Sequence, residues 1–293
     1  MPAVPFDYHA PATVAETLSA LAALGDDAKV LAGGQSLVPM LTLRLVRPAA
    51  IVDIYGLDEL RGVRLDGRTL EIGALVRHRA LEQAEGALAS CPLLSEAAAF
   101  IGNVRVRTMG TIGGSLAHAD PAAELPAVVR VLDGVLVARG PTGDRAIPAA
   151  EFFTGLLSTA LHPGELLAAV RLPLPDGRAG YAVEEFTRRA GDFAIVAAIA
   201  AVELDGLGRT SRVRVAIAGA GPAPVRLARV EAALGGVEPS ERVFRQAVKD
   251  QPLEIEPGDD IHASADYRRH LTRVLTARAL VRASARAAQG GRP

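Results

Sequence analysis

Cysteine is nearly absent from this sequence, since Cys91 is the only one among 293 residues. A single cysteine excludes an internal disulfide, and it excludes an iron–sulfur cluster held by four cysteines of this chain. No activating base stands beside Cys91 in the sequence. The pattern therefore predicts an inert thiol rather than a nucleophile.

Net charge and long apolar runs are missing as well. The formal net charge is -1 and the sequence pI is about 6.6, so no bulk field would attract nucleic acid or an anionic membrane. No apolar stretch is long enough to cross a bilayer, and the opening MPAVPFDYHAP lacks the basic start and apolar run of a secretory signal. We expect a cytoplasmic protein with no membrane span and no nucleic-acid partner.

Lysine is scarce too, and this decides between phosphate motifs. Lys29 and Lys249 are the only two, and neither stands in the Gly-x-x-x-x-Gly-Lys-Ser/Thr pattern of a P-loop. The stretch AGAGPAPVR has Pro224 where a dinucleotide-binding fingerprint needs its third glycine. We interpret that stretch as a turn from a strand to a helix.

Hydrophobic residues are plentiful, at 49%, which is enough for one large or two medium cores. Residues 11–25 predict a helix, with Thr13 and Glu16 at capping-box spacing and Gly25 at its end. A short strand precedes residue 32 and another covers 49–54, while Asp66-Gly67 predicts a tight hairpin. Strands and then a last helix over about 265–288 follow a Pro-Asp-Gly linker at 173–177. The order of elements indicates an α+β fold.

Two glycine-rich stretches are the candidates for chemistry. AGGQS, residues 32–36, follows a predicted strand, and TIGGSLAHADPAAELP covers 111–126. Successive glycines let backbone N–H groups converge on an anion. A lone Gly-Gly is usually an ordinary turn, but two such loops favour a pyrophosphate site.

These loops, their spacing and three longer stretches together resemble a known family. The stretches are IGNVRVRTMGTIGGSLAHADPAAELP, EFTRRAGDFAIVAAIAAVEL and AIAGAGPAPVRL. They resemble the FAD-binding medium subunit of molybdenum hydroxylases, which includes the flavoprotein subunit of carbon monoxide dehydrogenase and the flavin domain of xanthine dehydrogenase. The resemblance covers nearly the whole chain. It implies a two-part FAD-binding domain of the vanillyl-alcohol oxidase (PCMH) type over 1–175, with subdomains about 1–57 and 58–175, and a smaller C-terminal α+β domain over 178–288.

The resemblance also implies a set of cofactor contacts. They are Leu31, Ala32, Gly33, Gly34, Gln35, Ser36, Leu37, Val38, Ile101, Thr111, Ile112, Gly113, Gly114, Ser115, Glu124, Leu167, Asp192 and Phe193. The two loops are expected around the FAD pyrophosphate, and Ile101 and Phe193 beside the isoalloxazine ring. Glu124 stands where aspartate is frequent in the family. Phe193 stands where related chains often carry tyrosine, and a core position in a strand is its alternative interpretation.

Other polar residues suggest no further site. His118, Asp120 and Glu124 are not expected to bind a metal, because Pro121 and Pro126 interrupt helical presentation. His78 is expected at a solvated helix start. Solvation is the default for four arginines near the loops, although phosphate or partner contacts are alternatives. They are Arg44, Arg47, Arg105 and Arg107.

The residues include no catalytic pairing of a nucleophile with a base. The resemblance implies an electron-transfer subunit that holds FAD, takes electrons from a small iron–sulfur subunit and passes them to an external acceptor. A large subunit would hold the molybdenum cofactor, in a dimer of heterotrimers. One alternative is a stand-alone FAD-dependent reductase or oxidase of the same fold. Another is a scaffold that has lost the flavin, against which the intact glycines argue.

Overall fold

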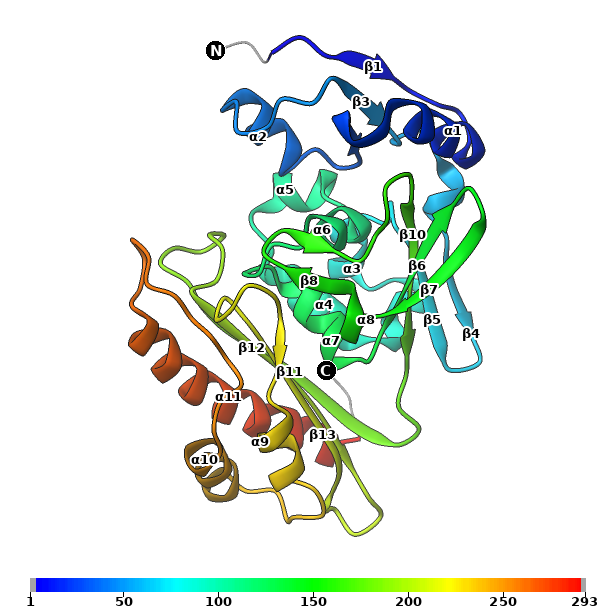
Figure 1. The fold of residues 1–293 in the computed structure, drawn as a ribbon. Coiled ribbons are helices and arrows are strands. Elements are labelled where there is room, and N and C mark those ends of the chain that lie inside the picture. Colours follow the sequence, from blue (N-terminus) through cyan, green and yellow to red (C-terminus); the bar gives the residue numbers. More distant parts are fainter. Residues whose placement is uncertain (1–3, 291–293) are drawn as a thin grey trace.

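The computed structural model describes residues 4–290, and it confirms the α+β class. Figure 1 shows three bodies along the chain: an N-terminal unit, a central unit and a C-terminal unit. Helices α5 and α6 of the central unit lie beneath α2 of the N-terminal unit. This arrangement brings the two glycine-rich stretches together.

The N-terminal unit is a three-stranded parallel sheet with two helices. Its elements are β1 (Asp7–His9), α1 (Val14–Leu24), β2 (Ala28–Leu31), α2 (Leu37–Thr42) and β3 (Ala50–Asp53), in strand order β1-β3-β2. The predicted cap of α1 is confirmed, because the Thr13 hydroxyl accepts a hydrogen bond from the Glu16 amide at 3.1 Å and Gly25 closes the helix at φ +63°. Strand β1 was not predicted, since its three residues gain strand geometry only by pairing with β3.

The central unit is a five-stranded antiparallel sheet covered by helices. Its strands, in the order β4-β5-β10-β6-β7, are β4 (Val63–Asp66), β5 (Thr69–Gly73), β10 (Leu166–Pro173), β6 (Val135–Gly140) and β7 (Gly143–Pro148). The helices are α3 (His78–Gln83), α4 (Pro92–Phe100), α5 (Val104–Met109), α6 (Ile112–His118), α7 (Glu124–Val131) and α8 (Ala149–Phe152). A small pair, β8 (Phe153–Gly155) and β9 (Ser158–Thr159), completes the unit. The predicted hairpin is confirmed, with Gly67 at φ +56°.

The C-terminal unit is an antiparallel sheet backed by helices. Its elements are β11 (Arg178–Phe186), β12 (Val196–Leu204), β13 (Thr210–Ala218), β14 (Val225–Arg226), α9 (Ala228–Ala233), α10 (Glu241–Asp250) and α11 (Ala265–Ala288). The last helix begins and ends as predicted. The stretch around Pro224 is a turn that leads through β14 to α9, as predicted.

Alternation along β11 decides which side chains face the central unit. Tyr181 and Val183 belong to the same hydrophobic core as α4 and α7, whereas Ala182 belongs to the core beneath α11. Side chains on a strand alternate between its two faces. Odd-numbered residues of β11 therefore point toward the central unit.

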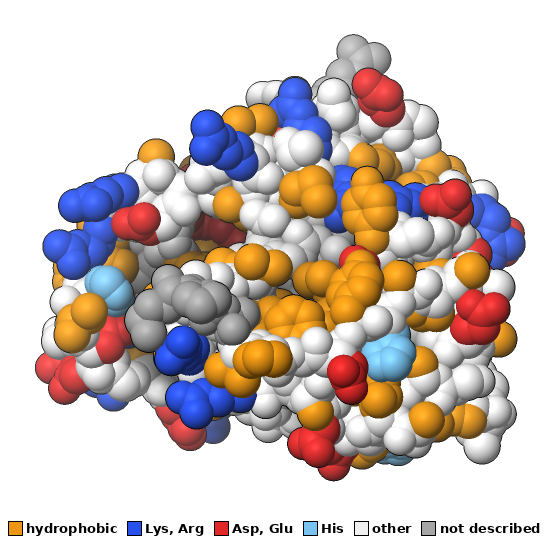
Figure 2. Space-filling view, turned by 90° about the horizontal axis from the view of Figure 1, so that it is seen from above, with side chains coloured by type: hydrophobic (Ala, Val, Ile, Leu, Met, Phe, Trp, Pro, Cys, Tyr) orange, Lys and Arg blue, Asp and Glu red, His pale blue; other side chains and the backbone are white. Residues whose placement is uncertain are grey.

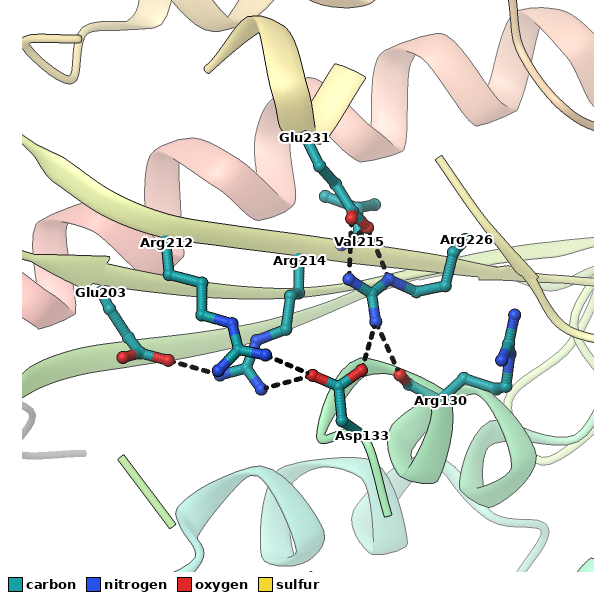
Figure 3. A network of polar contacts seen from close by, with 8 residues as sticks. All are labelled: Arg130, Asp133, Glu203, Arg212, Arg214, Val215, Arg226 and Glu231. Carbon is teal, nitrogen blue, oxygen red and sulfur yellow. Dashed lines mark hydrogen bonds and ion pairs between the residues drawn. The ribbon is translucent and has the colours of Figure 1, made fainter. Parts of the chain in front are cut away.

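An ion-pair network joins the central and C-terminal units at the end of α7 (Figure 3). Asp133 accepts from Arg212 at 2.7 Å, from Arg214 at 3.3 Å and from Arg226 at 2.8 Å. Arg226 also binds Glu231 at 2.5 Å, and Arg226 donates to the Arg130 carbonyl at 2.9 Å. The charges of β13 and β14 thus converge on one carboxylate of the central unit.

Cys91 is fully buried, and burial raises the pKa of its thiol to about 12. A thiol with that pKa is inert at neutral pH, as predicted. Within residues 4–290, none of the helices has the length and apolar character that a bilayer crossing requires.

Candidate functional site

The first loop, residues 32–36, connects β2 to α2 and exposes unpaired amides. The first amide of this region that donates within the chain is that of Val38, to the Gly34 carbonyl at 3.1 Å. The amides of residues 33–37 have no acceptor in the described part of the chain. Gly34 lies in the left-handed region at φ +71°, which turns successive N–H groups to one side. This loop has the donors that an anion requires.

The two loops pack directly on one another. Gly33 is buried, and a Cβ on it would lie 2.3 Å from the Met109 carbonyl oxygen and 2.8 Å from Gly110 Cα. A Cβ on Gly114 would lie 3.9 Å from Ala32 Cβ. Gly33 is therefore needed for backbone contact between the loops.

The second loop differs from the first, because its amides are already used. From Ile112 to Ser115 the four amides donate at 2.9–3.0 Å, in order, to Val76 O, Ala74 O, Thr111 Oγ1 and Thr111 O. Gly113 meets the chain so closely that a Cβ would lie 2.4 Å from Ala74 Cβ. The predicted nest of amides is thus found at the first loop alone. The second loop offers hydroxyl groups, those of Thr111 and Ser115.

Two segments expected beside the flavin ring lie against each other. Ile101 follows the last residue of α4 and is 9% exposed. The segment of Phe193 contacts the next residue, because a Cβ on Gly191 would lie 3.1 Å from the Gly102 carbonyl oxygen. Phe193 is 59% exposed and precedes β12, so its alternative interpretation as a core strand residue is wrong. The Asp192 amide closes the turn beside Gly191 by donating a hydrogen bond to the Arg189 carbonyl at 3.1 Å. An exposed aromatic ring therefore lies beside the Ile101 segment.

Leu167 is buried on β10, where the pairing with β6 shifts between Leu167 and Ala169. It shares a hydrophobic core with Ile101, and β10 packs against α6. The helix that carries the second loop and the strand that carries Leu167 are thus neighbours.

Glu124 is buried between the central and C-terminal units, and a half-buried residue that the sequence did not indicate, Glu185, points to the same region. Glu124 is 4% exposed at the start of α7, and burial, with the charge of Asp120, raises its pKa to about 7. Burial and then the Glu124 charge raise the pKa of Glu185 to about 8. The Oε2 atom of Glu185 is buried with no hydrogen-bond partner in the described residues. The stretch VEEF could have indicated Glu185, because one of two adjacent glutamates on a strand must face inward.

Two of the residues expected to be solvated are held within the fold instead, Arg107 half-buried and His78 buried. Arg107 donates to Glu82 at 3.0 Å and to the Ile101 and Gly102 carbonyls at 3.0 and 3.1 Å, so it fixes the Ile101 segment. His78 begins α3 as predicted but is 6% exposed, and burial lowers its pKa to about 4. Both predictions of solvated side chains were wrong because α3, α4 and α5 pack together. Arg44, Arg47 and Arg105 are exposed, as expected.

Apolar side chains gather around the two loops at the surface. Figure 2 views this end of the molecule, with apolar side chains across the face and basic ones at its margins. The exposed apolar residues of α2, α5 and the neighbouring loops are Val38, Leu43, Leu45, Val104, Met109 and Phe193. Within residues 4–290 no group of three or more His, Cys, Asp or Glu side chains is placed to hold a metal ion.

The described residues fit a flavin dinucleotide. Unpaired amides at the first loop and hydroxyls at the second suit a pyrophosphate. Ile101 and Phe193 supply apolar surface for a flat ring. The arrangement can bind a redox cofactor, and it contains no pairing of a nucleophile with a base.

Comparison with known families agrees with this arrangement. Residues 4–175 match the family described as the FAD binding domain in molybdopterin dehydrogenase. Residues 181–283 match the CO dehydrogenase flavoprotein C-terminal domain.

Full-length relatives and solved structures are similar as well. The chain is 41% identical to the alpha subunit of the 6-hydroxypseudooxynicotine dehydrogenase complex of Paenarthrobacter nicotinovorans, covering 96% of this chain and 95% of the relative. It is 34% identical to the carbon monoxide dehydrogenase medium chain of Afipia carboxidovorans, covering 96% and 98%. A structure of carbon monoxide dehydrogenase from Hydrogenophaga pseudoflava superposes with a TM-score of 0.94 at 37% identity, covering 98% of this chain and 99% of that chain.

Proposed function

Because the chain belongs to the family of FAD-binding medium subunits of molybdenum hydroxylases, we propose that it relays electrons from iron–sulfur clusters of a partner subunit, through FAD, to an external acceptor. The observation that carries the proposal is a full-length match to medium subunits by a chain with one buried cysteine, which cannot ligate a cluster itself. Bound FAD supplies a redox group that exchanges electrons singly or in pairs. The cytoplasmic location of the protein stays a prediction.

We assign the parts of the site as follows. The amides of the first loop, Leu31 to Val38, hold the pyrophosphate together with the hydroxyls of the second, Thr111 to Ser115. Ile101, Leu167, Asp192 and Phe193 hold and flank the ring, and Glu124 contacts the cofactor. The unpaired amides of residues 33–37 support the first assignment. Contact of Gly191 with Gly102 supports the second.

The proposed partners are a small iron–sulfur subunit and a large subunit with the molybdenum cofactor, assembled as a dimer of heterotrimers. The relatives are medium chains or subunits of dehydrogenase complexes. We propose an FAD-binding domain over 1–175, divided near residue 57, and a C-terminal domain over 178–288. The end of β10 at Pro173 and the start of β11 at Arg178 support that division.

We propose that the small subunit docks beside the exposed Phe193. Electron transfer from another subunit requires the ring edge to lie near a shared surface. The segments 101–105 and 188–193 lie side by side there, and Arg105, Arg188 and Arg189 are exposed. Aromatic residues and arginine are enriched in interfaces. Arg107 is excluded from this surface, because its guanidinium is held by Glu82 and by the Ile101 and Gly102 carbonyls.

Charge reversal tests the docking surface. Arg105→Glu with Arg188→Glu should leave FAD absorbance unchanged and slow the reduction of flavin by substrate in the reassembled complex. Reduction by dithionite should be unaffected, since it needs no partner. Arg242→Glu with Arg278→Glu, at exposed positions on α10 and α11, is a matched reversal away from the loops. Normal reduction by substrate in the first variant would show that docking lies elsewhere.

A further inference from the structure

An exposed tyrosine ring lies between two arginine side chains where the N-terminal unit joins the central unit. Tyr55 is the second residue after β3 and is 51% exposed. The guanidinium carbon of Arg61 lies 5.0 Å from the centre of its ring, and that of Arg77 lies 5.2 Å from it. Both distances are within the range of a cation–π contact. Because Arg61 precedes β4 and Arg77 precedes α3, the ring joins the end of the N-terminal unit to the central unit.

The backbone around Tyr55 is fixed to the strands that carry the first loop. The Tyr55 amide donates to Asp53 Oδ1 at 2.8 Å, and Asp53 Oδ2 accepts from the Tyr8 hydroxyl at 2.6 Å. The Ile54 amide donates to the Leu31 carbonyl at 3.0 Å, directly before the first loop begins. A movement of Tyr55 therefore moves the end of β2, from which the first loop starts.

Arg77 belongs to the segment that pairs with the second loop. Its backbone forms an isolated antiparallel bridge with Thr111. The next amide, that of His78, donates to the Gly110 carbonyl at 3.0 Å. The Arg77 guanidinium donates a hydrogen bond to the Met109 carbonyl. The backbone and the side chain of Arg77 thus bind one short stretch of the chain.

The Met109 carbonyl is also the point where the two loops touch. A Cβ on Gly33 would lie 2.3 Å from its oxygen, so the Gly33 backbone packs on this oxygen. A carbonyl oxygen is an acceptor and repels an anion, and this one lies beside the unpaired amides of the first loop. The hydrogen bond from a charged guanidinium offsets that repulsion. Arg77 therefore acts on both the position and the electrostatics of the first loop through one carbonyl group.

The two arginines at the Tyr55 ring differ in what else they bind. Arg77 joins the ring to the Met109 carbonyl, so it links the start of the first loop to the place where that loop meets the second. Arg61 instead donates to the Tyr55 carbonyl and pairs with Asp58 at 3.0 Å. Its contacts are local in the sequence and do not reach the loops. Arg61 is therefore a matched control for Arg77.

We propose that a clasp, made of the Tyr55 ring, the Arg77 guanidinium and the Met109 carbonyl, positions the first loop for the pyrophosphate of FAD. The clasp fixes the two loops relative to each other before FAD binds, so less conformational freedom is lost on binding. The Arg77 charge beside the loop favours an anionic group there. The inference rests on the FAD site of the proposed function and deepens it. Arg77 is a positioning residue, because it acts through Met109 and Gly33.

The test is the Kd of the full chain for FAD, by titration of the flavin-free protein. Arg77→Met should raise Kd by about tenfold, because a charged hydrogen bond and a cation–π contact are lost together. Arg77→Lys should recover part of this loss, since it keeps the charge but lacks the planar group that binds the ring and the carbonyl at once. Tyr55→Leu should raise Kd by about threefold, whereas Tyr55→Phe keeps the ring and should bind as the wild type does.

A double-mutant cycle shows whether Tyr55 and Arg77 act as one unit in binding. Arg77→Met combined with Tyr55→Leu should raise Kd by less than the product of the two single effects, because each variant opens the same clasp. Urea unfolding of the same flavin-free chains separates this effect from stability. A contact that serves the fold alone would show the coupling in unfolding and leave Kd unchanged. Arg61→Met should bind FAD with the wild-type Kd.

The outcomes distinguish the clasp from the FAD site itself. A wild-type Kd in Arg77→Met, or an equal increase in Arg61→Met, would overturn the clasp and leave the FAD site standing. If Arg77→Met does not fold, the two Tyr55 variants decide, and equal Kd values in Tyr55→Leu and Tyr55→Phe would overturn the clasp. Absence of FAD binding by the wild-type chain would overturn the FAD site as well.

Discussion

Helix α7 brings an acidic residue to the C-terminal unit at each end, and the two residues meet opposite surroundings. Just beyond its C-terminal end, Asp133 binds three arginines. At its N-terminal end, Glu124 is buried with no ion pair in the described residues, and burial, with the charge of Asp120, raises its pKa to about 7. One end neutralises its charge within the chain, and the other leaves it uncompensated.

We infer that the Asp133 end of α7 serves the fold and that the Glu124 end serves the cofactor. Charges that are fully paired hold two units in one arrangement, as at Asp133. Uncompensated buried groups destabilise a fold, and they concentrate at functional sites. The Glu124 end is also the end next to the glycine-rich loops. We therefore expect variants at the Asp133 end to change stability and variants at the Glu124 end to change flavin binding.

The largest effect is expected at the first loop. Gly33→Val should abolish FAD binding, because its side chain would intrude on the Met109 carbonyl and displace the loop amides. Gly56→Val is the matched control, since a Cβ at Gly56 meets nothing within 4 Å. Flavin absorbance after purification measures both. Full flavin content in a folded Gly33→Val chain would refute the assignment of this loop.

At the Asp133 end the expected effect is on stability. Asp133→Asn should lower the free energy of unfolding by about 1.5 kcal/mol, because three arginines lose a shared charged acceptor, although Arg214 keeps its ion pair with Glu203 at 2.5 Å. Asparagine tolerates the left-handed backbone of this position, at φ +51°. Asp144→Asn, at a largely exposed pair with Arg139, should cost less than about 1 kcal/mol.

Urea unfolding measures both values, and the flavin content of Asp133→Asn should be unchanged. Equal losses of stability in the two variants would contradict the structural role of the Asp133 network. A loss of flavin from Asp133→Asn would contradict the division of roles between the two ends.

The raised pKa values near the Glu124 end of α7 predict that stability depends on pH. The pKa of Glu124 is raised from the ordinary 4.5 to about 7 and that of Glu185 to about 8. From the ordinary pKa up to these raised values, the folded chain therefore binds more protons than the unfolded chain. Stability must then fall as pH rises through this window and level off above it. Glu185→Gln should remove most of a loss of about 2 kcal/mol. Thermal unfolding of the flavin-free chain at several pH values measures this loss. If stability changes with pH as steeply in Glu185→Gln as in the wild type, Glu185 is already ionised in the folded chain.

The smallest effect is expected at the exposed edge of the network. Arg212→Ala should cost less than about 1 kcal/mol, because 57% of its side chain is exposed and solvent screens the pair with Asp133. Arg214→Ala, with a side chain 5% exposed, should cost several times more. Unfolding in urea ranks the two, and a reversed order would contradict the account of burial.

Local signals in the sequence predicted much of the fold. Capping at Thr13, the turn at Gly67 and the span of α11 depend on neighbours in sequence, and all three are confirmed. Strand β1 was missed, because its geometry comes from pairing with β3. Strand β7 was missed for the same reason, since it alternates weakly and pairs at the edge of its sheet with β6.

Contacts between distant segments explain what was missed at the site. The glycine spacing in both loops suggested free amides, but Ala74 and Val76 take those of the second loop. Packing of α3 against α4 and α5 buries His78 and pairs Arg107 with Glu82, which sequence alone cannot anticipate. Glu185 could be placed toward the central unit only once the structure showed which residues of β11 face that unit.

The most direct test of the electron relay follows flavin absorbance after anaerobic mixing with the complex's substrate. We expect rapid flavin reduction in the assembled complex, and no reduction when the isolated chain or a complex with a cluster-free small subunit is mixed with the same substrate. Dithionite should reduce the flavin in all three samples. Rapid reduction of the isolated chain by substrate would contradict the relay and show that this chain oxidises the substrate itself.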